Sequence, residues 1–361
     1  MWYERMSFFR KLVTNFFPPP RFLEMPAVGI DISDEVIRFA ELTRKGSAFE
    51  LGVYGQEKMP QGIIEEGYIK DIGAFSKVLE GLRKKHGFYF VKASLPDEKA
   101  YLFKTRIPIM DESEVRGALQ FKIEENVPIS LADAVYDFAL INSDTKNSTQ
   151  MDVSVTVIHQ KVVTSYLSAF HKAGLVPLKL RTEAQAIAHS VIPLNDSSTY
   201  VVISLRETKT VMSIVSHNVV QFTSSLPIGG RSIADSIKKQ MSVDEAEVEK
   251  IRQGRVVRNN EEVFMSIVNT ASVIRNEIKK FFIYWDGHIE NRESLKIQHI
   301  LLTGSDTLLG LDRYLAQSFE VPVVIADAWK NILSINDVIP PITHHESLDY
   351  IPALGLALPH D

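Results

Sequence analysis

The sequence predicts an α/β protein built from two related halves with a cleft between them. Residues 28–42 and residues 200–215 carry this prediction, because each segment reads as an apolar strand, a short polar turn and an alternating second strand. A chain of 361 residues is long enough for two domains or one bilobed body. Two such hairpins, about half a chain apart, indicate a duplicated architecture.

The composition excludes several classes of protein. With 45% hydrophobic and 24% charged residues, the chain has the make-up of a soluble globular protein. A net charge of −5 gives no reason to expect nucleic-acid binding. The absence of cysteine excludes disulfides and thiolate metal sites, and it fits a reducing cytoplasm. No apolar run approaches the roughly 20 residues that span a bilayer.

The N-terminal residues 1–17 are predicted to form an amphipathic helix, because apolar residues recur there at spacings of three and four. A basic, aromatic-rich helix of this kind suits a membrane surface, or it docks on a protein, and the sequence leaves both alternatives open. Residues 18–25 are predicted to be a proline-rich linker, since three consecutive prolines end the helix.

The first lobe is assigned to residues 26–100 and 176–196. A helix over 72–86 has its apolar residues on one face and ends at Gly87. A short helix is expected over 184–191. The strands of this lobe are expected at 28–32, 36–42, 48–55 and 90–95.

Residues 101–175 are predicted to form a smaller α+β subdomain inserted in the first lobe. A helix begins near Asp111, where acidic residues in the first turn suit the helix dipole. The remaining elements are expected to be strands at 134–141 and 152–159 and a helix over 161–173.

The second lobe is assigned to residues 197–358. Residues 340–347, which include His344 and His345, are predicted to be a solvated polar loop, followed by a short final helix from Leu354. The other helices of this lobe are expected at 231–241, 244–253, 260–285 and between Asp306 and Phe319. Its strands beyond the hairpin are expected at 219–226, 298–303 and 323–325.

This order of motifs resembles that of the actin-like ATPase superfamily, and more narrowly the PilM family of type IV pilus assembly proteins, which is related to FtsA of bacterial cell division. The resemblance covers roughly residues 26–358, and it implies a bilobed, duplicated ribonuclease-H-like fold with the FtsA/PilM type of inserted subdomain. The motifs that carry it are V-G-I-D-I-S at 28–33, I-E-E-N-V-P-I at 123–129, P-I-G-G at 227–230, L-L-T-G at 301–304 and P-A-L-G-L-A-L at 352–358.

The resemblance implies that the first turn meets the phosphates of a nucleotide. Asp31 takes the position of a carboxylate that orders water around a magnesium ion, which makes it a candidate catalytic and metal-site residue. Gly29 and Ser33 flank it, and backbone amides of an open turn can cradle phosphate. Asp34 and Glu35 would repel a polyphosphate. The alternative for Asp31 is a turn-forming residue at a strand end.

The second turn departs from the pattern of the superfamily. Ser204 and Arg206 stand where an aspartate and a glycine are usual. A serine cannot act as a carboxylate base, and an arginine side chain crowds the approach of a phosphate to the backbone. The guanidinium of Arg206 can instead bind phosphate oxygens directly. Thr208 and Thr210 keep hydroxyls nearby.

Glu183 opens an element that resembles the interdomain segment whose acid faces the magnesium shell, and it is the second candidate catalytic residue. An ordinary acid in the first turn of a helix is the alternative. The resemblance implies that three glycines and one ion pair contact the adenosine of the nucleotide. The alternative for the ion pair is an ordinary solvent-exposed pair on a helix. These residues are Gly229, Gly230, Gly304, Glu277 and Lys280.

The resemblance implies a cytoplasmic scaffold, peripheral at the inner face of the cell membrane, in the inner-membrane platform of a type IV pilus or a related secretion system. It would bind the cytoplasmic tail of a PilN-like membrane partner in the cleft beside the inserted subdomain. The altered turns imply a degenerate site for ATP and Mg2+, and hence a pseudo-ATPase or very weak ATPase. The alternative is an active, filament-forming, FtsA-like ATPase. No motif for a small-molecule kinase is legible.

Overall fold

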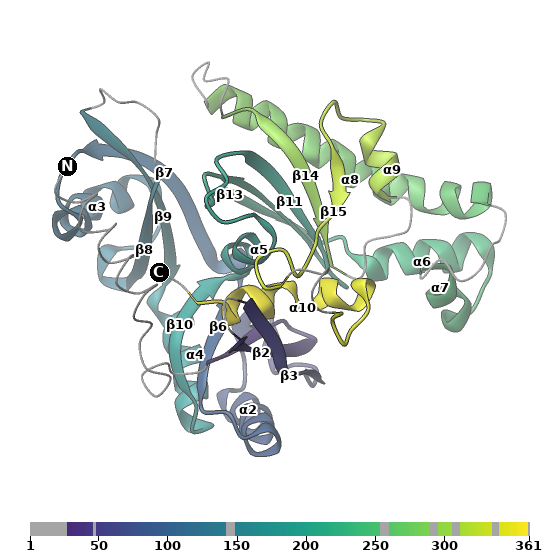
Figure 1. Cartoon of the computed structure of the whole chain (residues 1–361), viewed down its shortest axis with the longest axis horizontal. Coiled ribbons are helices and arrows are strands. Elements are labelled where there is room, and N and C mark those ends of the chain that lie inside the picture. Colours follow the sequence, from purple (N-terminus) through teal and green to yellow (C-terminus); the bar gives the residue numbers. More distant parts are fainter. Residues whose placement is uncertain are drawn as a thin grey trace.

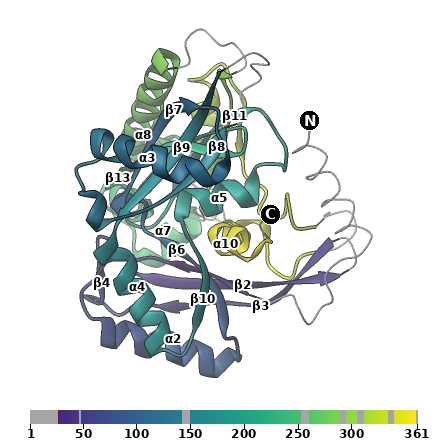
Figure 2. The ribbon, with the colours of Figure 1, turned by 90° about the vertical axis from the view of Figure 1, so that its left-hand side faces the viewer.

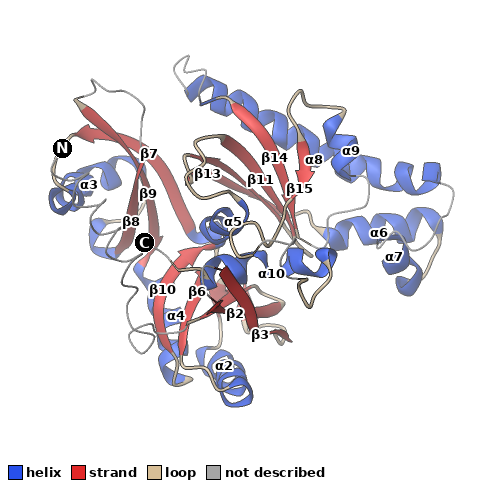
Figure 3. Cartoon of the chain, viewed as in Figure 1, coloured by secondary structure: helices blue, strands red, loops and turns tan. Residues whose placement is uncertain are grey.

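The computed structural model of the chain describes residues 27–45, 48–141, 149–252, 260–288, 295–304, 311–333 and 339–359. The predicted helix 1–17 and linker 18–25 lie outside these residues. Two five-stranded sheets and a smaller three-stranded sheet, each with its own helices, make up the molecule (Figures 1 and 3). Within the described part of the chain, no helix is both long enough and apolar enough to cross a bilayer.

The first-lobe sheet has the strand order β10-β6-β1-β2-β3. An antiparallel meander forms one side of it, and two strands parallel to β1 form the other. Its strands are β1 (Val28–Ile32), β2 (Val36–Lys45), β3 (Ala48–Lys58), β6 (Phe90–Leu95) and β10 (Val176–Thr182). A two-stranded ribbon, β4 (Ile64–Glu65) and β5 (Tyr68–Ile69), precedes helix α2 (Ile72–His86). Gly87 ends α2, as the sequence predicts, and it does so in a left-handed conformation.

The second-lobe sheet repeats this arrangement, with the strand order β13-β12-β11-β14-β15. Again three antiparallel strands are followed by two parallel ones, which confirms the predicted duplication. Its strands are β11 (Thr199–Leu205), β12 (Thr210–Ser216), β13 (Val219–Leu226), β14 (Ile297–Thr303) and β15 (Val323–Ile325). Its helices are α6 (Gly230–Met241), α7 (Glu245–Arg252), α8 (Asn260–His288) and α9 (Leu311–Ala316).

The inserted subdomain is a three-stranded sheet of order β7-β9-β8 with one helix on it. Its elements are β7 (Ala100–Pro108), α3 (Glu112–Asn126), β8 (Ala134–Ile141) and β9 (Gln150–His159). The next helix, α4 (Gln160–Lys172), was expected in the insert but packs into the core of the first lobe, where Tyr166 and Phe170 join Phe75 and Leu79 of α2. An apolar stripe predicts that a helix is buried on one side, but not against which neighbour.

The last helix, α10 (His344–Ala357), starts ten residues earlier than the sequence analysis expected. Thr343 accepts a hydrogen bond from the amide of Glu346 and the Glu346 side chain bonds back to Thr343, so the predicted polar loop is instead a capping box. Figure 2 shows α10 in the middle of the molecule, above the first-lobe sheet. It packs on β1, β2 and α5 (Glu183–Val191).

Two glycines let α10 approach its neighbours closely. A Cβ on Gly29 of β1 would lie 1.9 Å from the carbonyl oxygen of Ala353, and one on Gly355 of α10 would lie 1.9 Å from the carbonyl oxygen of Ala186. Gly29, expected to flank a phosphate, therefore faces α10, because it lies within β1 and not in the turn after it. The absence of a side chain at Gly29 allows the backbone of α10 to pack directly against the backbone of β1.

We expect Gly29→Ala to lower the free energy of unfolding by about 1–3 kcal/mol, because β1 and α10 must move apart. Gly81→Ala is the matched control, since a Cβ there meets nothing within 4 Å on helix α2, and it should stabilise the chain by about 0.5–1 kcal/mol. Urea denaturation of both variants measures the difference. Equal stability of the two would contradict the close packing.

Candidate functional site

The turns of the two hairpins face each other across a cleft between the lobes. The cleft has a volume of about 340 Å³. It is lined from both turns. Seven of the residues that the sequence analysis singled out are among its walls: Ser33, Asp34, Glu35, Ser204, Arg206, Thr208 and Gly304. Gly29, Gly229, Gly230, Glu277 and Lys280 do not line this cleft.

At the base of the cleft, Arg206 lies between two buried acids of the first lobe. Its Nη2 donates to Asp31 Oδ2, and its Nε lies 2.9 Å from Glu183 Oε1. The side chains of Asp31 and Glu183 are 1% and 3% exposed, and that of Arg206 is 11% exposed. The other oxygen of Asp31 accepts a 3.0 Å hydrogen bond from Ser94 Oγ. The structure thus joins three sequence candidates in one ion-pair network.

The network includes three residues that the sequence analysis did not identify. Asp97 and Glu98 form a single 3-10 turn directly after β6, and Asp97 Oδ2 accepts a 2.9 Å hydrogen bond from the amide of Ala184. Lys209 Nζ donates to Glu98 Oε2 at 2.8 Å and lies 3.9 Å from Glu183 Oε2. The position of Asp97 and Glu98 just after a predicted strand could have indicated them, because the carboxyl ends of parallel strands share one edge of a sheet.

Burial and charge shift the pKa values of this network. Burial, and then the negative charge of Glu183, raise the pKa of Asp97 to about 7. Burial also raises the pKa of Glu183, although Arg206 and Lys209 oppose the shift. Burial alone would lower the pKa of Arg206, but Asp31 and Glu183 raise it, so the guanidinium stays charged.

A second contact between the lobes lies at the rim of the cleft. Arg231, in the first turn of α6, donates to Glu35 Oε1 at 2.8 Å and to Glu207 Oε1 at 2.6 Å. The backbone amides of Gly230 and Arg231 donate to the carbonyl oxygens of Arg206 and Glu207 at 2.8 and 2.7 Å. The amides at this end of α6 are therefore used by the protein's own turn.

Two other glycines allow the second turn to pack tightly. A Cβ on Gly229 would lie 2.3 Å from the carbonyl oxygen of Arg206, and one on Gly304 would lie 2.0 Å from that of Leu205. Gly304 also has φ +91°, a conformation that favours glycine. Both glycines bring backbone segments against the β11–β12 turn.

The predicted adenosine-side pair lies on α8. Lys280 Nζ donates to Glu277 Oε1 at 2.5 Å, and the Lys280 side chain is 69% exposed. This geometry is that of an ion pair one helical turn apart, which is the alternative that the sequence left open. Asp306, two residues after Gly304, lies outside the described residues.

The residues at the base of the cleft do not fit a magnesium ion as they are arranged. A metal bound through water to Asp31 needs access to a carboxylate oxygen, whereas one oxygen accepts from Ser94 and the other pairs with Arg206. The described residues also hold no group of three or more histidine, aspartate or glutamate side chains suited to a metal ion. The guanidinium uses the carboxylate oxygen that Ser94 does not.

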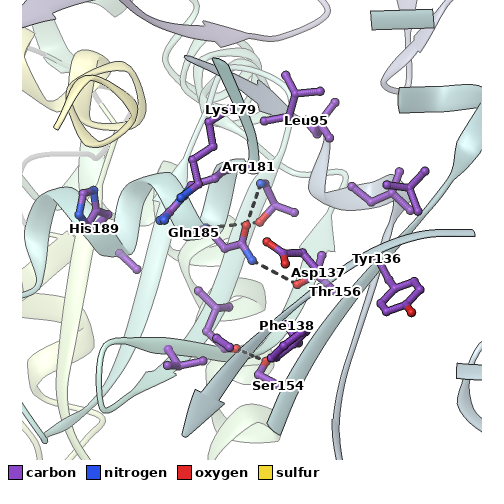
Figure 4. Close-up of a pocket in the computed structure, with 18 of the residues that line it drawn as sticks. Leu95, Tyr136, Asp137, Phe138, Ser154, Thr156, Lys179, Arg181, Gln185 and His189 are labelled. Atoms are coloured by element: carbon purple, nitrogen blue, oxygen red, sulfur yellow. Dashed lines mark hydrogen bonds between the residues drawn. The ribbon is translucent and has the colours of Figure 1, made fainter. Parts of the chain in front are cut away.

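A second cavity, of about 420 Å³, lies where the insert meets both lobes. Its walls come from β8, β9, β10, α5 and the start of β13, and Figure 4 shows the side chains that line it. Both β8 and β10 are edge strands of their sheets, so each leaves backbone groups unpaired along one side. A partner cleft beside the insert is what the family resemblance implies, but the sequence alone does not identify these residues.

Most polar groups of this groove, the cavity between β8 and β10, are already bonded within the protein. Gln185 Nε2 donates to Thr156 Oγ1 at 3.2 Å, and His189 Nδ1 lies 2.8 Å from the carbonyl oxygen of Gly355. The side chains of Lys179 and Arg181, by contrast, make no hydrogen bond or ion pair with a described residue, although the negative charge of Asp137 acts on both. Burial lowers the pKa of both, and Arg181 adds to the shift of Lys179. Two cations in this groove are therefore free to meet a ligand.

Comparisons with known proteins identify the family of this architecture. The chain matches the family model described as type IV pilus assembly protein PilM over residues 29–360. It is similar to a chain of the PilM–PilN type IV pilus biogenesis complex, with 18% identity and a TM-score of 0.73, over 92% of this chain and 97% of the other. It is also similar to the ethanolamine utilization protein EutJ from Carboxydothermus hydrogenoformans, with 13% identity and a TM-score of 0.51, over 94% and 90% of the two chains. These similarities confirm the actin-like fold.

We expect Asp97→Asn to stabilise the protein increasingly as the pH rises. The pKa of Asp97 is about 7 in the folded state, up from 3.8, so the folded chain holds a proton that the unfolded chain releases, and wild-type stability falls across this window. Asparagine keeps an oxygen for the Ala184 amide but does not ionise. Thermal unfolding at about pH 5 and about pH 8 should show the advantage of the variant growing by at least about 1 kcal/mol. A gap that is independent of pH would contradict the shift.

Proposed function

This chain belongs to the PilM family of type IV pilus assembly proteins, and we propose that it acts as a cytoplasmic scaffold at the inner face of the cell membrane, holding the tail of a PilN-like partner. The observation that carries the proposal is the groove between β8 and β10. The similar PilM chain comes from a complex with PilN. The platform served is that of a type IV pilus or a related secretion system.

The groove suits an extended peptide segment. Unpaired backbone groups of edge strands can form hydrogen bonds with an added strand, which gives affinity without large side-chain contacts. Its walls combine apolar residues with cations, since Val135 and Phe138 line it together with Lys179 and Arg181. Figure 4 shows Phe138, Lys179 and Arg181 among the lining side chains. A bound segment would therefore place apolar side chains on the β8 wall.

The side chains of Lys179 and Arg181 indicate which hydrogen-bonding groups the bound segment should carry. Lys179 and Arg181 are two residues apart on β10, so their side chains leave the strand on the same side, roughly 6.6 Å apart along it. Both are donors only. The segment should therefore offer oxygen acceptors to them, from a carboxylate, a carboxamide or its own backbone.

The interlobe cleft has, in this proposal, a minor role in nucleotide chemistry. Arg206 and Lys209 neutralise the acids that would otherwise order a metal and its water. Ser204, in the second turn, cannot replace a catalytic carboxylate. We therefore propose a pseudo-ATPase or very weak ATPase, which binds ATP weakly and hydrolyses it poorly.

Arg181→Ala should weaken binding of the partner's tail about tenfold, because a hydrogen bond to a charged donor is lost. Calorimetry with a synthetic peptide of that tail measures the affinity. Lys172→Ala is the matched control, since it removes one exposed positive charge on α4, outside the groove. An equal loss in both variants would show that only net charge matters. Failure of the wild-type chain to bind the tail would refute the scaffold proposal.

Phosphate release from ATP in the presence of Mg2+ should be no faster for the wild-type chain than for Asp31→Ala, because Arg206 pairs with this carboxylate. The assay uses purified chain and measures released phosphate over time. Hydrolysis well above the Asp31→Ala level would favour the alternative, an active FtsA-like ATPase.

Residues 1–17 are proposed to recruit the chain to the membrane surface or to the platform. Deleting them should leave the body folded and reduce the membrane-associated fraction after cell fractionation. Circular dichroism of the shortened chain controls for folding. Unchanged association with membranes would remove this role from the segment.

A further inference from the structure

The actin-like fold implies a nucleotide and a metal between its lobes, and the residues here disagree with that expectation. Three acids of the first lobe and two cations of the second meet at the base of the cleft instead. We propose that Arg206 is a built-in counter-ion that holds the lobes together without metal or nucleotide. By doing so it keeps the groove between β8 and β10 in its binding shape, and this second role rests on the proposed function.

The ion pairs cross from one lobe to the other. Asp31 lies in β1 and Glu183 opens α5, both in the first lobe, whereas Arg206 directly follows β11 of the second. A single guanidinium thus connects two elements of one lobe to the turn of the other, with Asp31 on one of its nitrogens and Glu183 near another. A cation with several donors in one plane suits this task better than a point charge.

The position of the guanidinium is fixed from its backbone. The amide of Arg206 donates to the carbonyl oxygen of Lys209 at 2.9 Å, which closes the turn. Its own carbonyl oxygen accepts a hydrogen bond from the Gly230 amide. Gly229 has no Cβ and therefore leaves room for this carbonyl oxygen. The turn is therefore held by α6, and the side chain has no need of a ligand to point at the acids.

Removal of this cation would leave the buried carboxylate of Asp31 without its ion-pair partner and that of Glu183 with only the more distant Lys209. An unpaired buried charge is strongly destabilising, and breaking a buried pair from one side costs more than the pair contributes. Lys209 lies 3.9 Å from Glu183 and already pairs with Glu98. The remaining acids would repel one another across the base of the cleft.

The same lobes form the walls of the groove. Glu183 begins α5, and Gln185 and His189 of that helix line the groove. Val219 and Val220 of the second lobe line it from the other side, where the Val220 carbonyl oxygen accepts a 2.7 Å hydrogen bond from Ser154 Oγ of the insert. The relative position of the lobes therefore sets the width of the groove.

The first test needs only the wild-type chain. Its melting temperature in millimolar Mg2+ with ATP should exceed that in EDTA by no more than weak binding supplies, because the acids already have their counter-ion. A clear Mg2+-dependent rise with ATP would overturn the proposal, since it would show that a metal nucleotide completes the closed state.

The second test compares two arginines of the same cleft. Arg206→Ala should lower the melting temperature by several degrees, whereas Arg231→Ala, whose side chain is 53% exposed at the rim, should change it little. Arg206→Lys keeps the charge but loses the planar fork, so its melting temperature should lie between those of wild type and Arg206→Ala. This variant replaces Arg206→Ala in the comparison if the alanine variant does not fold. Equal melting temperatures for Arg206→Lys, Arg231→Ala and wild type would overturn the proposal.

The third test links the counter-ion to the groove. Arg206→Lys should weaken binding of the tail peptide at least about fivefold, although residue 206 does not line the groove. Unchanged affinity would overturn the coupling. If the wild-type chain does not bind the peptide at all, the scaffold proposal fails, while the two melting experiments still decide whether Arg206 holds the lobes.

Discussion

The arrangement of charge at one edge of the first-lobe sheet constrains much of this structure. Strands β1, β6 and β10 are parallel, and an acid stands at or just beyond the end of each: Asp31, Asp97 and Glu183. Carboxylates buried so close together need cations, because neither water nor the protein interior can screen them there. The second lobe supplies Arg206 and Lys209 from a single turn, so the packing of the lobes and the neutralisation of the acids are one event.

The sequence predicted the architecture well where local chemistry decides it. Two strand–turn–strand patterns gave the repeated sheets, and Gly87 marked the end of α2 because only a left-handed residue fits there. The sequence does not predict the start of α10, because a polar, histidine-containing stretch is typical of a loop, although Thr343 and Glu346 have capping-box spacing. The place of α4 was wrong for another reason: the choice between two apolar neighbours is made by the tertiary fold.

The candidate site shows a sharper limit. Asp31, Glu183 and Arg206 were each singled out from their positions, but nothing in the sequence showed that they meet, since the two turns are 175 residues apart. Arg206 was expected to face a phosphate, and its partners are acids of its own chain. Gly29 shows the same limit, since a glycine that packs a helix and one that admits a ligand look alike in a sequence.

The edge strands of the groove have a further consequence for chain association. Val135, Leu140, Val176 and Leu178 are each about two-fifths exposed along β8 and β10, and unpaired strand edges with apolar side chains are templates for runaway self-association. Two copies meeting through β10 would bring Lys179 and Arg181 of one copy against those of the other. Their mutual repulsion would oppose the pairing of two identical β10 edges.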